Sequence, residues 1–465
     1  MSEPARLSPQ MLGALPASVG VPGYDRDAQA VGIVHFGIGA FHRAHQAWYT
    51  DAAMAAGDRD WAILGVSLRS PEVARQMNPQ AGLYALAERD GTGARTRVIG
   101  AVRGVLVAGE DPEAVIAAVA APATRIVTLT ITEKGYCRDA RGDLDFALAD
   151  EGSVYRFLAE GLARRRQAGL AGLTLLSCDN LAANGQVLEH LMGQYLARHH
   201  PDLAAWCFAQ CTFPSTMVDR IVPATTDADR AALRADLAAL TDEACVVTEP
   251  FSQWVIEDRF AGPRPRWDAV GAQIVADVAP YELAKLRMLN GAHSLLAYCG
   301  LARGHTFVHE AVADPELRAL ALKLMREEAA PTIAAATGQD LGAYAEALIA
   351  RFDNRALNHR LLQIAMDGSQ KLPQRWLATL ADNAARGRTC PAILAGLGAW
   401  IGHLRGYNGE VADPLADGLA MAARSAEPVM QLFGPGCLLA SSWQPTRDDA
   451  EQIVSAIPST PHALT

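Results

Sequence analysis

The sequence predicts an α/β fold in which a Rossmann-like, doubly wound parallel sheet is followed by a mostly α-helical domain. In the first 280 residues, short β-branched runs alternate with helical stretches, which is typical of a parallel sheet covered by helices. Beyond about residue 280 the strand-like runs thin out, and Ala- and Leu-rich amphipathic segments dominate. We therefore expect a sheet domain at residues 1–280 and a helical domain at residues 281–465.

Length and composition limit the class of protein. The chain has 465 residues, of which 50% are hydrophobic and 20% charged, and its formal net charge is −10. This apolar fraction excludes a disordered protein, which cannot bury enough surface to offset its ordering entropy. The length exceeds what one hydrophobic core usually supports, which favours two domains. The acidic balance argues against nucleic acid as a partner, because phosphate neutralisation needs clustered Lys and Arg.

Five short runs of aliphatic and β-branched residues are the predicted strands of the first domain. They lie at residues 31–36, 61–66, 98–102, 125–131 and 173–177. Helix-like stretches separate several of these runs and lie at residues 44–56, 112–120 and 155–168. The predicted helices of the second domain lie at residues 280–299, 315–330, 342–352, 391–404 and 413–424. Residues 1–28 are rich in Pro, Gly and Ser and are expected to be irregular.

No feature of the sequence indicates a membrane or secreted protein. No stretch approaches the ~18 uninterrupted apolar residues of a membrane span. The N-terminal Met1-Ser2-Glu3-Pro4 begins neither a basic region nor an apolar run, so we expect no signal peptide. The eight cysteines are scattered, and the closest pair, Cys207 and Cys211, suits neither a zinc ribbon nor a disulfide framework. We therefore expect a cytoplasmic protein with reduced thiols and no bound metal.

A glycine turn follows the first predicted strand. Gly37 and Gly39 are separated by one residue, and Ala40, Phe41 and His42 open the next helix. In this setting, glycines permit a tight turn and the close approach of a pyrophosphate, which rests on the helix N-terminus. His42 occupies the place of the third glycine of that fingerprint, and an ordinary strand-to-helix turn is the alternative. Two histidines and an arginine in this part of the helix favour an anionic ligand.

The end of the second predicted strand bears on the choice between NAD and NADP. A carboxylate that holds a ribose hydroxyl is usual here, but the chain reads Ser67-Leu68-Arg69-Ser70, with no carboxylate before Glu72. Arg69 and Ser70 would tolerate a 2′-phosphate. We therefore expect a nicotinamide dinucleotide with Arg69 close to it, NAD being the prediction and NADP staying open.

Polar residues also follow the other predicted strands. Glu133 comes after the fourth strand, and Asp179 and Asn180 come directly after the fifth. Carboxyl ends of parallel strands border the ligand crevice, so these side chains are placed for ligand contact. A simpler interpretation is that they form turns. Asp219 and Arg220 are adjacent in apolar surroundings, where an intramolecular ion pair is the simpler account.

The stretch from residue 280 to residue 293 is the most informative segment. It is apolar over much of its helical surface and should be buried, yet it carries Lys285, Asn290 and His293. At ~100° per residue, these three side chains fall within an arc of ~140° on an α-helix. Burial lowers the pKa of a lysine, so Lys285 suits a general base, and the Asn290 amide suits a donor to a carbonyl or alkoxide oxygen. The alternative is a core helix whose polar groups bond backbone carbonyls.

In order and content these motifs resemble the mannitol dehydrogenase family, the long-chain polyol dehydrogenases that use no metal. The similarity runs from about residue 37 to residue 293, and the polar loop that ends at Lys371 is similar too. The matching motifs are Gly37 to Gln46, Thr130 to Tyr136, Ser177 to Asn180, Met217 to Ile221 and Lys285 to His293. Five motifs in one order are specific, whereas a lone Gly-x-Gly turn is not.

The resemblance implies a role for each matching residue. Lys285 corresponds to the general base that removes the hydroxyl proton, and Asn180 and Asn290 correspond to two amides around the reacting oxygen. His293 is similar to the residue that orients the substrate and contacts the lysine. Glu282 is similar to the carboxylate on the lysine's proton route to solvent.

Five further positions lie near the expected substrate site. Asp219 and Lys371 match positions near the substrate in the family, although the loop that ends at Lys371 is also consistent with a helix-ending turn. Gln363 stands where mannitol 2-dehydrogenases tend to carry an arginine. A hexonate would need a cation for its carboxylate, and Arg360, Lys371 and Arg375 are nearby in the sequence.

The predicted function is a metal-independent oxidoreductase that interconverts a secondary alcohol and a ketone, as in D-mannonate/D-fructuronate or D-mannitol/D-fructose. Residues 249–258 and 363–375 look most like mannonate (fructuronate) oxidoreductases, and some bacterial mannitol dehydrogenases are similar. The alternatives are a sugar-phosphate dehydrogenase of the mannitol 1-phosphate type and a dinucleotide-binding sensor without turnover. The expected partner is a small polyol or hexonate, with neither nucleic acid nor membrane, and the chain is expected to be a monomer or small homo-oligomer.

Overall fold

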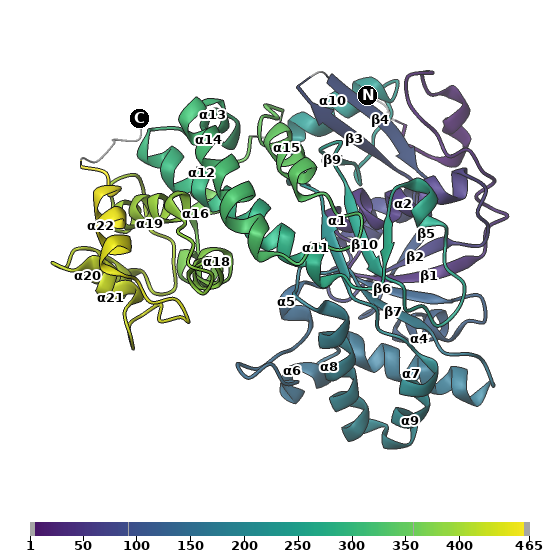
Figure 1. The fold of residues 1–465 in the computed structure, drawn as a ribbon. Coiled ribbons are helices and arrows are strands. Elements are labelled where there is room, and N and C mark those ends of the chain that lie inside the picture. Colours follow the sequence, from purple (N-terminus) through teal and green to yellow (C-terminus); the bar gives the residue numbers. More distant parts are fainter. Residues whose placement is uncertain (1–4, 92, 357, 460–465) are drawn as a thin grey trace. The chain divides into compact units, whose positions relative to one another are not determined.

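The structure is a computed structural model that describes residues 5–91, 93–356 and 358–459. The chain divides between Val278 and Ala279 into two compact units, both drawn in Figure 1. All strands of the described residues lie in the first unit, whereas the described part of the second unit consists of helices and the loops between them. The predicted fold class is confirmed.

A five-stranded parallel sheet forms the centre of the first unit (Figure 1). Its strands are β1 (Val31–Phe36), β2 (Ala62–Ser67), β5 (Val102–Val107), β6 (Ile126–Leu129) and β7 (Thr174–Ser177). Their spatial order is β5-β2-β1-β6-β7, and every neighbouring pair is parallel. From β1 the chain adds strands first on one side and then on the other, so the topological switch point lies between β1 and β6. The loops that leave these two strands border the crevice where such folds bind ligands.

Helices occupy the crossovers between the strands of the first unit. They are α1 (Ala40–Ala44), α2 (Gln46–Ala55), α3 (Glu72–Met77), α4 (Pro112–Ala120), α5 (Thr132–Gly135), α6 (Phe146–Asp150), α7 (Val154–Gln167), α8 (Asn184–His199), α9 (Pro201–Gln210) and α10 (Asp227–Asp236). Helix α4 has the predicted bounds, because Pro112 suits a first helical turn and the Asp111 carboxylate caps it by accepting from the Ala114 amide at 2.9 Å. The predicted helix at residues 44–56 is interrupted at His45, whose backbone is non-helical.

Alternate residues of the sheet pack into two separate cores. Val34 and Phe36 of β1 lie in a core that α4, α7 and α8 complete, whereas Ile33 lies in a second core with α1 and α2. Strands that are covered on both faces read as continuous apolar runs instead of alternating ones. This burial explains why four of the five strands were predictable from the sequence.

The predicted strand at residues 98–102 is wrong. The backbone there contains the end of β4 (Gly93–Ile99) and the beginning of β5, which belong to different sheets. β4 forms an antiparallel hairpin with β3 (Tyr84–Asp90), which the sequence analysis missed. Only Gly100 and Ala101 separate β4 from β5, so the apolar ends of two strands read as one run.

Two three-stranded sheets complete the first unit. One contains β4, β3 and β9 (Val246–Thr248), and the other contains β11 (Gln273–Val275), β10 (Gln253–Glu257) and β8 (Thr216–Asp219). β8 and β10 are antiparallel, with Asp219 directly opposite Gln253. Short 3₁₀ turns lie at Pro9–Ala14, Asn78–Gln80 and Trp267–Val270.

The second unit is built from α-helices and three π-helical turns. Its α-helices are α11 (Ala279–Ala284), α12 (Asn290–Ala302), α13 (Val308–Ala313), α14 (Pro315–Lys323), α15 (Leu341–Phe352), α16 (Leu361–Ala365), α17 (Gly368–Leu372), α18 (Ala378–Ala384), α19 (Pro391–Leu404), α20 (Ala416–Ala423), α21 (Pro428–Phe433) and α22 (Arg447–Ser455). The π turns are η4 (Lys285–Leu289), η5 (Leu324–Ala329) and η7 (Pro373–Leu377), and a 3₁₀ turn lies at Ala330–Thr332. η4 packs against both η5 and η7, so the three π turns are neighbours.

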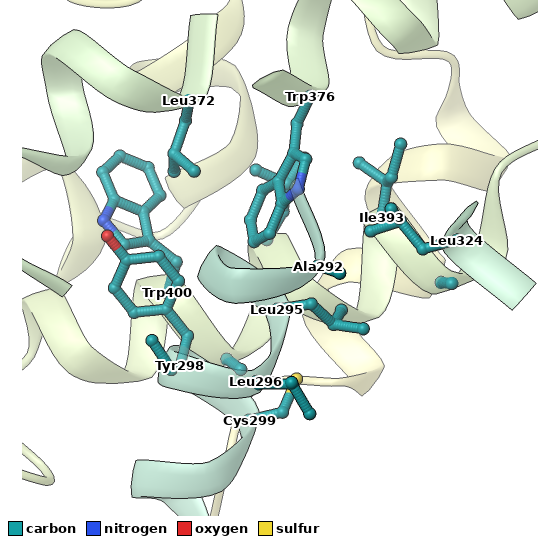
Figure 2. Close-up of a cluster of buried hydrophobic side chains, with 14 of the residues drawn as sticks. Ala292, Leu295, Leu296, Tyr298, Cys299, Leu324, Leu372, Trp376, Ile393 and Trp400 are labelled. Atoms are coloured by element: carbon teal, nitrogen blue, oxygen red, sulfur yellow. The ribbon is translucent and has the colours of Figure 1, made fainter. Parts of the chain in front are cut away.

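A single core fills the second unit and is centred on α12. Figure 2 shows part of it, with the Trp376 indole over the backbone of α12 near Ala292. Trp376 and Trp400 are both fully buried. None of the helices in the described residues has the length and apolar character that crossing a membrane would require.

Candidate active site

The glycine turn after β1 is a tight reversal that leaves open space beside Gly39. Gly37 has φ +91°, and a Cβ there would lie 2.0 Å from the Thr130 carbonyl oxygen, so only glycine fits. Gly39 caps α1 with an ordinary φ of −77°, and a Cβ there would meet nothing closer than the Gly37 oxygen at 3.9 Å. Gly39 is exposed, and Ala40 and Phe41 are half-buried. The backbone at Gly39 is therefore accessible to a ligand, as a pyrophosphate site requires.

His42 lies beneath this turn and not on its surface, so its side chain is not exposed to a ligand, and its assignment to the cofactor stays a prediction. Its ring is fully buried and stacks on His35, with the ring centroids 3.4 Å apart. His35 in turn contacts the Thr128 hydroxyl of β6 at 2.7 Å. Burial lowers the pKa of His42 well below its usual value and that of His35 to about 3, so both imidazoles are neutral near pH 7. Arg43 is also buried, so these side chains support the turn from inside.

The other two residues predicted for the cofactor, Arg69 and Glu133, and the predicted catalytic residue Asn180 lie at the carboxyl edge of the same sheet. Arg69 follows β2, Glu133 lies in α5 after β6, and Asn180 follows β7, and all three are exposed. The neighbouring Asp179 is buried and accepts backbone amides of Ile131 and Thr132 at 3.0 and 2.8 Å. Asp179 therefore fixes the loop after β6 against the end of β7. Its role is structural, and Asn180 is the accessible residue of the pair.

Asp219 ends β8, outside the five-stranded sheet, and is 5% exposed. The next residue, Arg220, forms an ion pair with Glu88 of β3 at 2.5 Å and donates to the Ala44 carbonyl at 2.6 Å. It also donates to the Glu249 carbonyl at 2.9 Å. Arg220 thus joins three segments of the first unit, which is a structural function.

In the second unit, Lys285 begins the π turn η4 and Asn290 follows the turn's last residue. The Asn290 backbone N–H donates to the Lys285 carbonyl, five residues earlier. A π turn adds one residue to each helical turn, so the ~140° arc predicted for a regular α-helix does not describe this segment. The wider turn rotates Asn290 toward the same side of the helix as Lys285. Both residues are half-buried, as is Glu282 in α11.

His293 lies one turn further along α12, in an aromatic pocket. Its ring centroid is 4.6 Å from that of Phe352 and 5.5 Å from that of His359. Burial, reinforced by His359, Arg351 and Arg375, lowers its pKa well below the usual value. Its Nε2 atom has no hydrogen-bond partner among the described residues. His293 is therefore a neutral imidazole whose buried Nε2 atom has an unused hydrogen-bonding capacity.

Two successive residues of η7 hold the start of α12. The sequence predicted Arg375 only as a cation near the substrate, and it predicted no role for Trp376. Arg375 Nη1 donates to the Asn290 carbonyl at 3.3 Å and to the Ser294 hydroxyl at 2.9 Å. Trp376 Nε1 donates to the Gly291 carbonyl at 3.1 Å. These bonds fix the backbone on both sides of the junction between η4 and α12. No local pattern reveals them, since the partners are about 85 residues apart in the chain.

The loop before Lys371 packs closely on the same core. A Cβ on Gly368 would lie 2.6 Å from Trp400 Nε1 and 2.7 Å from the Tyr298 hydroxyl, so glycine permits this approach. The Lys371 ammonium donates to the Met366 carbonyl at 2.6 Å, and burial lowers its pKa. The structure thus connects Lys371, through its neighbour Arg375, with the segment that carries Asn290 and His293.

Gln363 and Arg360 differ from Lys371 in their surroundings. Both are exposed on the second unit, and the Arg360 guanidinium lies 5.7 Å from the centroid of the Phe307 ring. Their assignment to the substrate stays a prediction. In the described residues, no group of three or more His, Cys, Asp or Glu side chains is placed to hold a metal ion.

Comparison with known sequences identifies both parts of the chain. Residues 31–269 match the family model of the mannitol dehydrogenase Rossmann domain, and residues 277–433 match that of the mannitol dehydrogenase C-terminal domain. D-mannonate oxidoreductase of Escherichia coli (strain K12) is 41% identical over 85% of this chain and 85% of its own length. A mannitol 2-dehydrogenase of Aspergillus fumigatus is 38% identical over 90% of this chain and 88% of its own length.

Solved structures give the same result. A D-sorbitol dehydrogenase in substrate-free form has a TM-score of 0.90 and 34% identity, covering 97% of both chains. The mannitol 2-dehydrogenase of Pseudomonas fluorescens, in a ternary complex with NAD and D-mannitol, has a TM-score of 0.81 and 36% identity, covering 97% of this chain and 96% of its own. The predicted resemblance is confirmed, and the chain belongs to the mannitol dehydrogenase family.

Proposed function

We propose that the protein is a metal-independent, NAD-dependent oxidoreductase that interconverts a secondary alcohol of a hexitol or hexonate and the corresponding ketose or keto-acid. The observation that carries the proposal is the arrangement at η4, where the half-buried Lys285 precedes Asn290 and the neutral His293. Relatives named D-mannonate oxidoreductase and mannitol 2-dehydrogenase support this substrate class. D-mannonate/D-fructuronate and D-mannitol/D-fructose are the pairs we propose.

The first unit fits a nicotinamide dinucleotide. The open backbone at Gly39 would receive the pyrophosphate, and the close packing of Gly37 on Thr130 fixes that turn. Arg69 and Glu133 are exposed at the same edge of the sheet and would contact the rest of the cofactor. The similar mannitol 2-dehydrogenase structure contains NAD, which favours NAD over NADP. When bound, NAD accepts the hydride that the alcohol carbon loses.

The second unit would supply the proton chemistry. A lysine that is partly removed from water loses its proton more readily, so neutral Lys285 would take the hydroxyl proton of the substrate. The Asn290 amide would donate to the oxygen as it gains negative charge, and Asn180 of the first unit is the proposed second amide. The buried His293 Nε2 would bond a neighbouring hydroxyl, and Glu282 would relay the proton from Lys285 toward solvent.

Substrate oxidation by a matched set of variants tests this proposal. The formation of reduced nicotinamide would be followed with D-mannitol, D-sorbitol, D-arabinitol, D-mannonate, D-altronate and D-mannitol 1-phosphate. Lys285→Ala should lower kcat by about 10²- to 10⁴-fold while NAD binding, measured by calorimetry, stays near that of the wild type. Lys323→Ala removes a lysine of α14 and serves as the control. Near-normal turnover by Lys285→Ala would show that another group is the base, and activity on no hexitol or hexonate would reject the function.

A further inference from the structure

The π turn η4 (Lys285–Leu289) sets the angle between two residues of the proposed site. Relaxation of η4 to a regular α-helical turn would rotate Asn290 relative to Lys285 by roughly 100°, the rotation of one residue. The two side chains would then no longer lie on the same side of the helix. Because π turns are rare alternatives to α-helical turns, contacts from outside the helix are expected to hold this one.

Arg375 bridges the first turn of the helix that follows η4. Its Nη1 atom donates to the Asn290 carbonyl at 3.3 Å and to the Ser294 hydroxyl at 2.9 Å. Asn290 and Ser294 are four residues apart and therefore face the same side of α12, one turn from each other. The guanidinium is half-buried, and hydrogen bonds that are shielded from water are electrostatically stronger than exposed ones. Arg375 thus fixes the end of η4 relative to α12.

Trp376 holds the next carbonyl along the same helix. Its Nε1 atom donates to the Gly291 carbonyl at 3.1 Å, and its fully buried indole lies over the backbone of α12 (Figure 2). At the opposite edge of the ring, a Cβ on Gly396 of α19 would lie 2.8 Å from the indole, so a glycine leaves the space in which the ring sits. The indole is therefore fixed at both edges, between α19 and α12.

We propose that Arg375 and Trp376 are positioning residues that hold η4 as a π turn and so keep Lys285 and Asn290 on one side of the helix. The proposal rests on the proposed function, since it concerns how the proposed base and amide are placed. Both residues belong to η7, which is itself a π turn packed against η4. Their donors bond backbone carbonyls of two successive residues, so they act on the course of the helix and not on the substrate.

The test measures turnover, ligand binding and local backbone opening in the same full-length variants. Trp376→Phe removes the indole N–H but keeps an aromatic ring in the core, Arg375→Gln removes the guanidinium, and Arg375→Lys keeps a charged donor. Trp443→Phe is the matched control for tryptophan, since Trp443 is buried in the same core. Arg405→Gln is the matched control for arginine, since Arg405 is half-buried and donates to the Ala423 carbonyl at 2.8 Å.

Two kinds of measurement are made on each variant. The values of kcat and KM are determined with NAD and whichever of D-mannitol and D-mannonate the wild type oxidises faster, and calorimetry gives the affinity for NAD. Deuterium uptake of peptides that cover η4 and the start of α12, followed by mass spectrometry, reports the opening of the turn without any turnover. Tm shows how much stability each substitution removes.

We expect Trp376→Phe and Arg375→Gln to lower kcat by about 10- to 100-fold, because small misplacements of catalytic groups are costly, while KM and NAD affinity change by less than about threefold. Deuterium uptake of η4 should rise in both, Arg375→Lys should recover part of kcat, and the two controls should keep the wild-type kcat. Trp376→Phe decides the outcome if Arg375→Gln does not fold. A lower Tm with an unchanged kcat, or a lower kcat with unchanged uptake at η4, would overturn the positioning role. A wild type that oxidises no hexitol or hexonate would instead reject the proposed function.

Discussion

Two glycines of one turn are required for different physical reasons. At Gly37 the backbone adopts φ +91°, and a Cβ would collide with the Thr130 oxygen, so the requirement is steric and conformational. At Gly39 the φ of −77° suits any residue, and the space beside it is open. The first glycine therefore belongs to the fold, whereas the second leaves room for a ligand.

Alanine substitutions separate these two requirements. Gly37→Ala should lower the free energy of unfolding by at least ~2 kcal/mol, because it adds a left-handed alanine to a backbone clash. Gly39→Ala should unfold like the wild type but bind NAD at least ~10-fold more weakly, because its methyl group occupies the space of the pyrophosphate. Urea denaturation and calorimetric titration with NAD measure the two effects. A destabilised Gly39→Ala, or a Gly37→Ala of normal stability, would contradict this division.

A single functional residue is predictable from the sequence when its chemistry conflicts with its local surroundings. Lys285 was recognisable because burying an ammonium group in an apolar helix costs free energy unless the group is paired. The burial of His42 was not predictable, because the spacing of a motif does not show on which side of a turn a ring lies. The contacts of Arg375 and His359 with α12 were not predicted, since they join segments far apart in the chain. Tertiary contacts of this kind have no local signature.

Among the elements, the π turns explain where the helical prediction is inaccurate. The predicted helix at residues 280–299 is helical throughout, but the π turn η4 inserts an extra residue per turn between Lys285 and Asn290. An apolar stretch of this length has the same composition with or without such a turn, so periodicity does not show it. The same limitation applies to η5, inside the predicted helix at residues 315–330. π turns are rare and concentrate at functional sites, which suits the neighbourhood of η4 and η7.

Glu328 of η5 gives this group of helices a pH dependence. Its buried carboxylate accepts the amides of Ala392 and Ile393, at 2.7 and 3.0 Å, and so caps α19. Burial outweighs these bonds and raises its pKa to about 7. The native state then binds more protons than the unfolded state between pH ~4.5 and ~7, so its contribution to stability falls as pH rises through that window. The free energy of unfolding should therefore fall by on the order of 3 kcal/mol across this window and stay constant above pH ~7.

Substitution of Glu328 by glutamine isolates this effect. The free energy of unfolding of Glu328→Gln, measured in urea between pH 4.5 and 8, should lack the component that the wild type loses as pH rises. Glu410→Gln is the control, because Glu410 is an exposed carboxylate of the second unit and is not among the charges that shift the pKa of Glu328. Parallel pH profiles for wild type and Glu328→Gln would mean that Glu328 ionises normally and that its capping bonds dominate.

For the whole molecule, the fold class follows from the two ways in which the units bury apolar surface. The first unit covers both faces of a parallel sheet, which produces short apolar runs, and the second packs helices around one core. The hairpin of β3 and β4 was not predicted, because it belongs to a separate sheet and not to the parallel sheet that helices cover on both faces. The net charge of −10 describes the chain as a whole and does not show where its cations lie, such as Lys371 and Arg375, which are close enough to repel each other.

We propose that residues of the first unit bind NAD and that residues of the second supply the proton chemistry. The stabilisation of the protein by NAD should therefore depend on residues of the first unit. A ligand that binds only the native state stabilises it by RT ln(1 + [L]/Kd), which is about 2.7 kcal/mol at 100 times Kd. If the residues of the first unit hold NAD, the cofactor should raise the Tm of Arg375→Gln and Lys285→Ala as much as that of the wild type. Gly39→Ala should need at least ~10-fold more NAD for the same shift. Scanning calorimetry over a range of NAD concentrations measures this pattern, and a shift that Arg375→Gln loses would place part of the cofactor's binding energy on the helical unit.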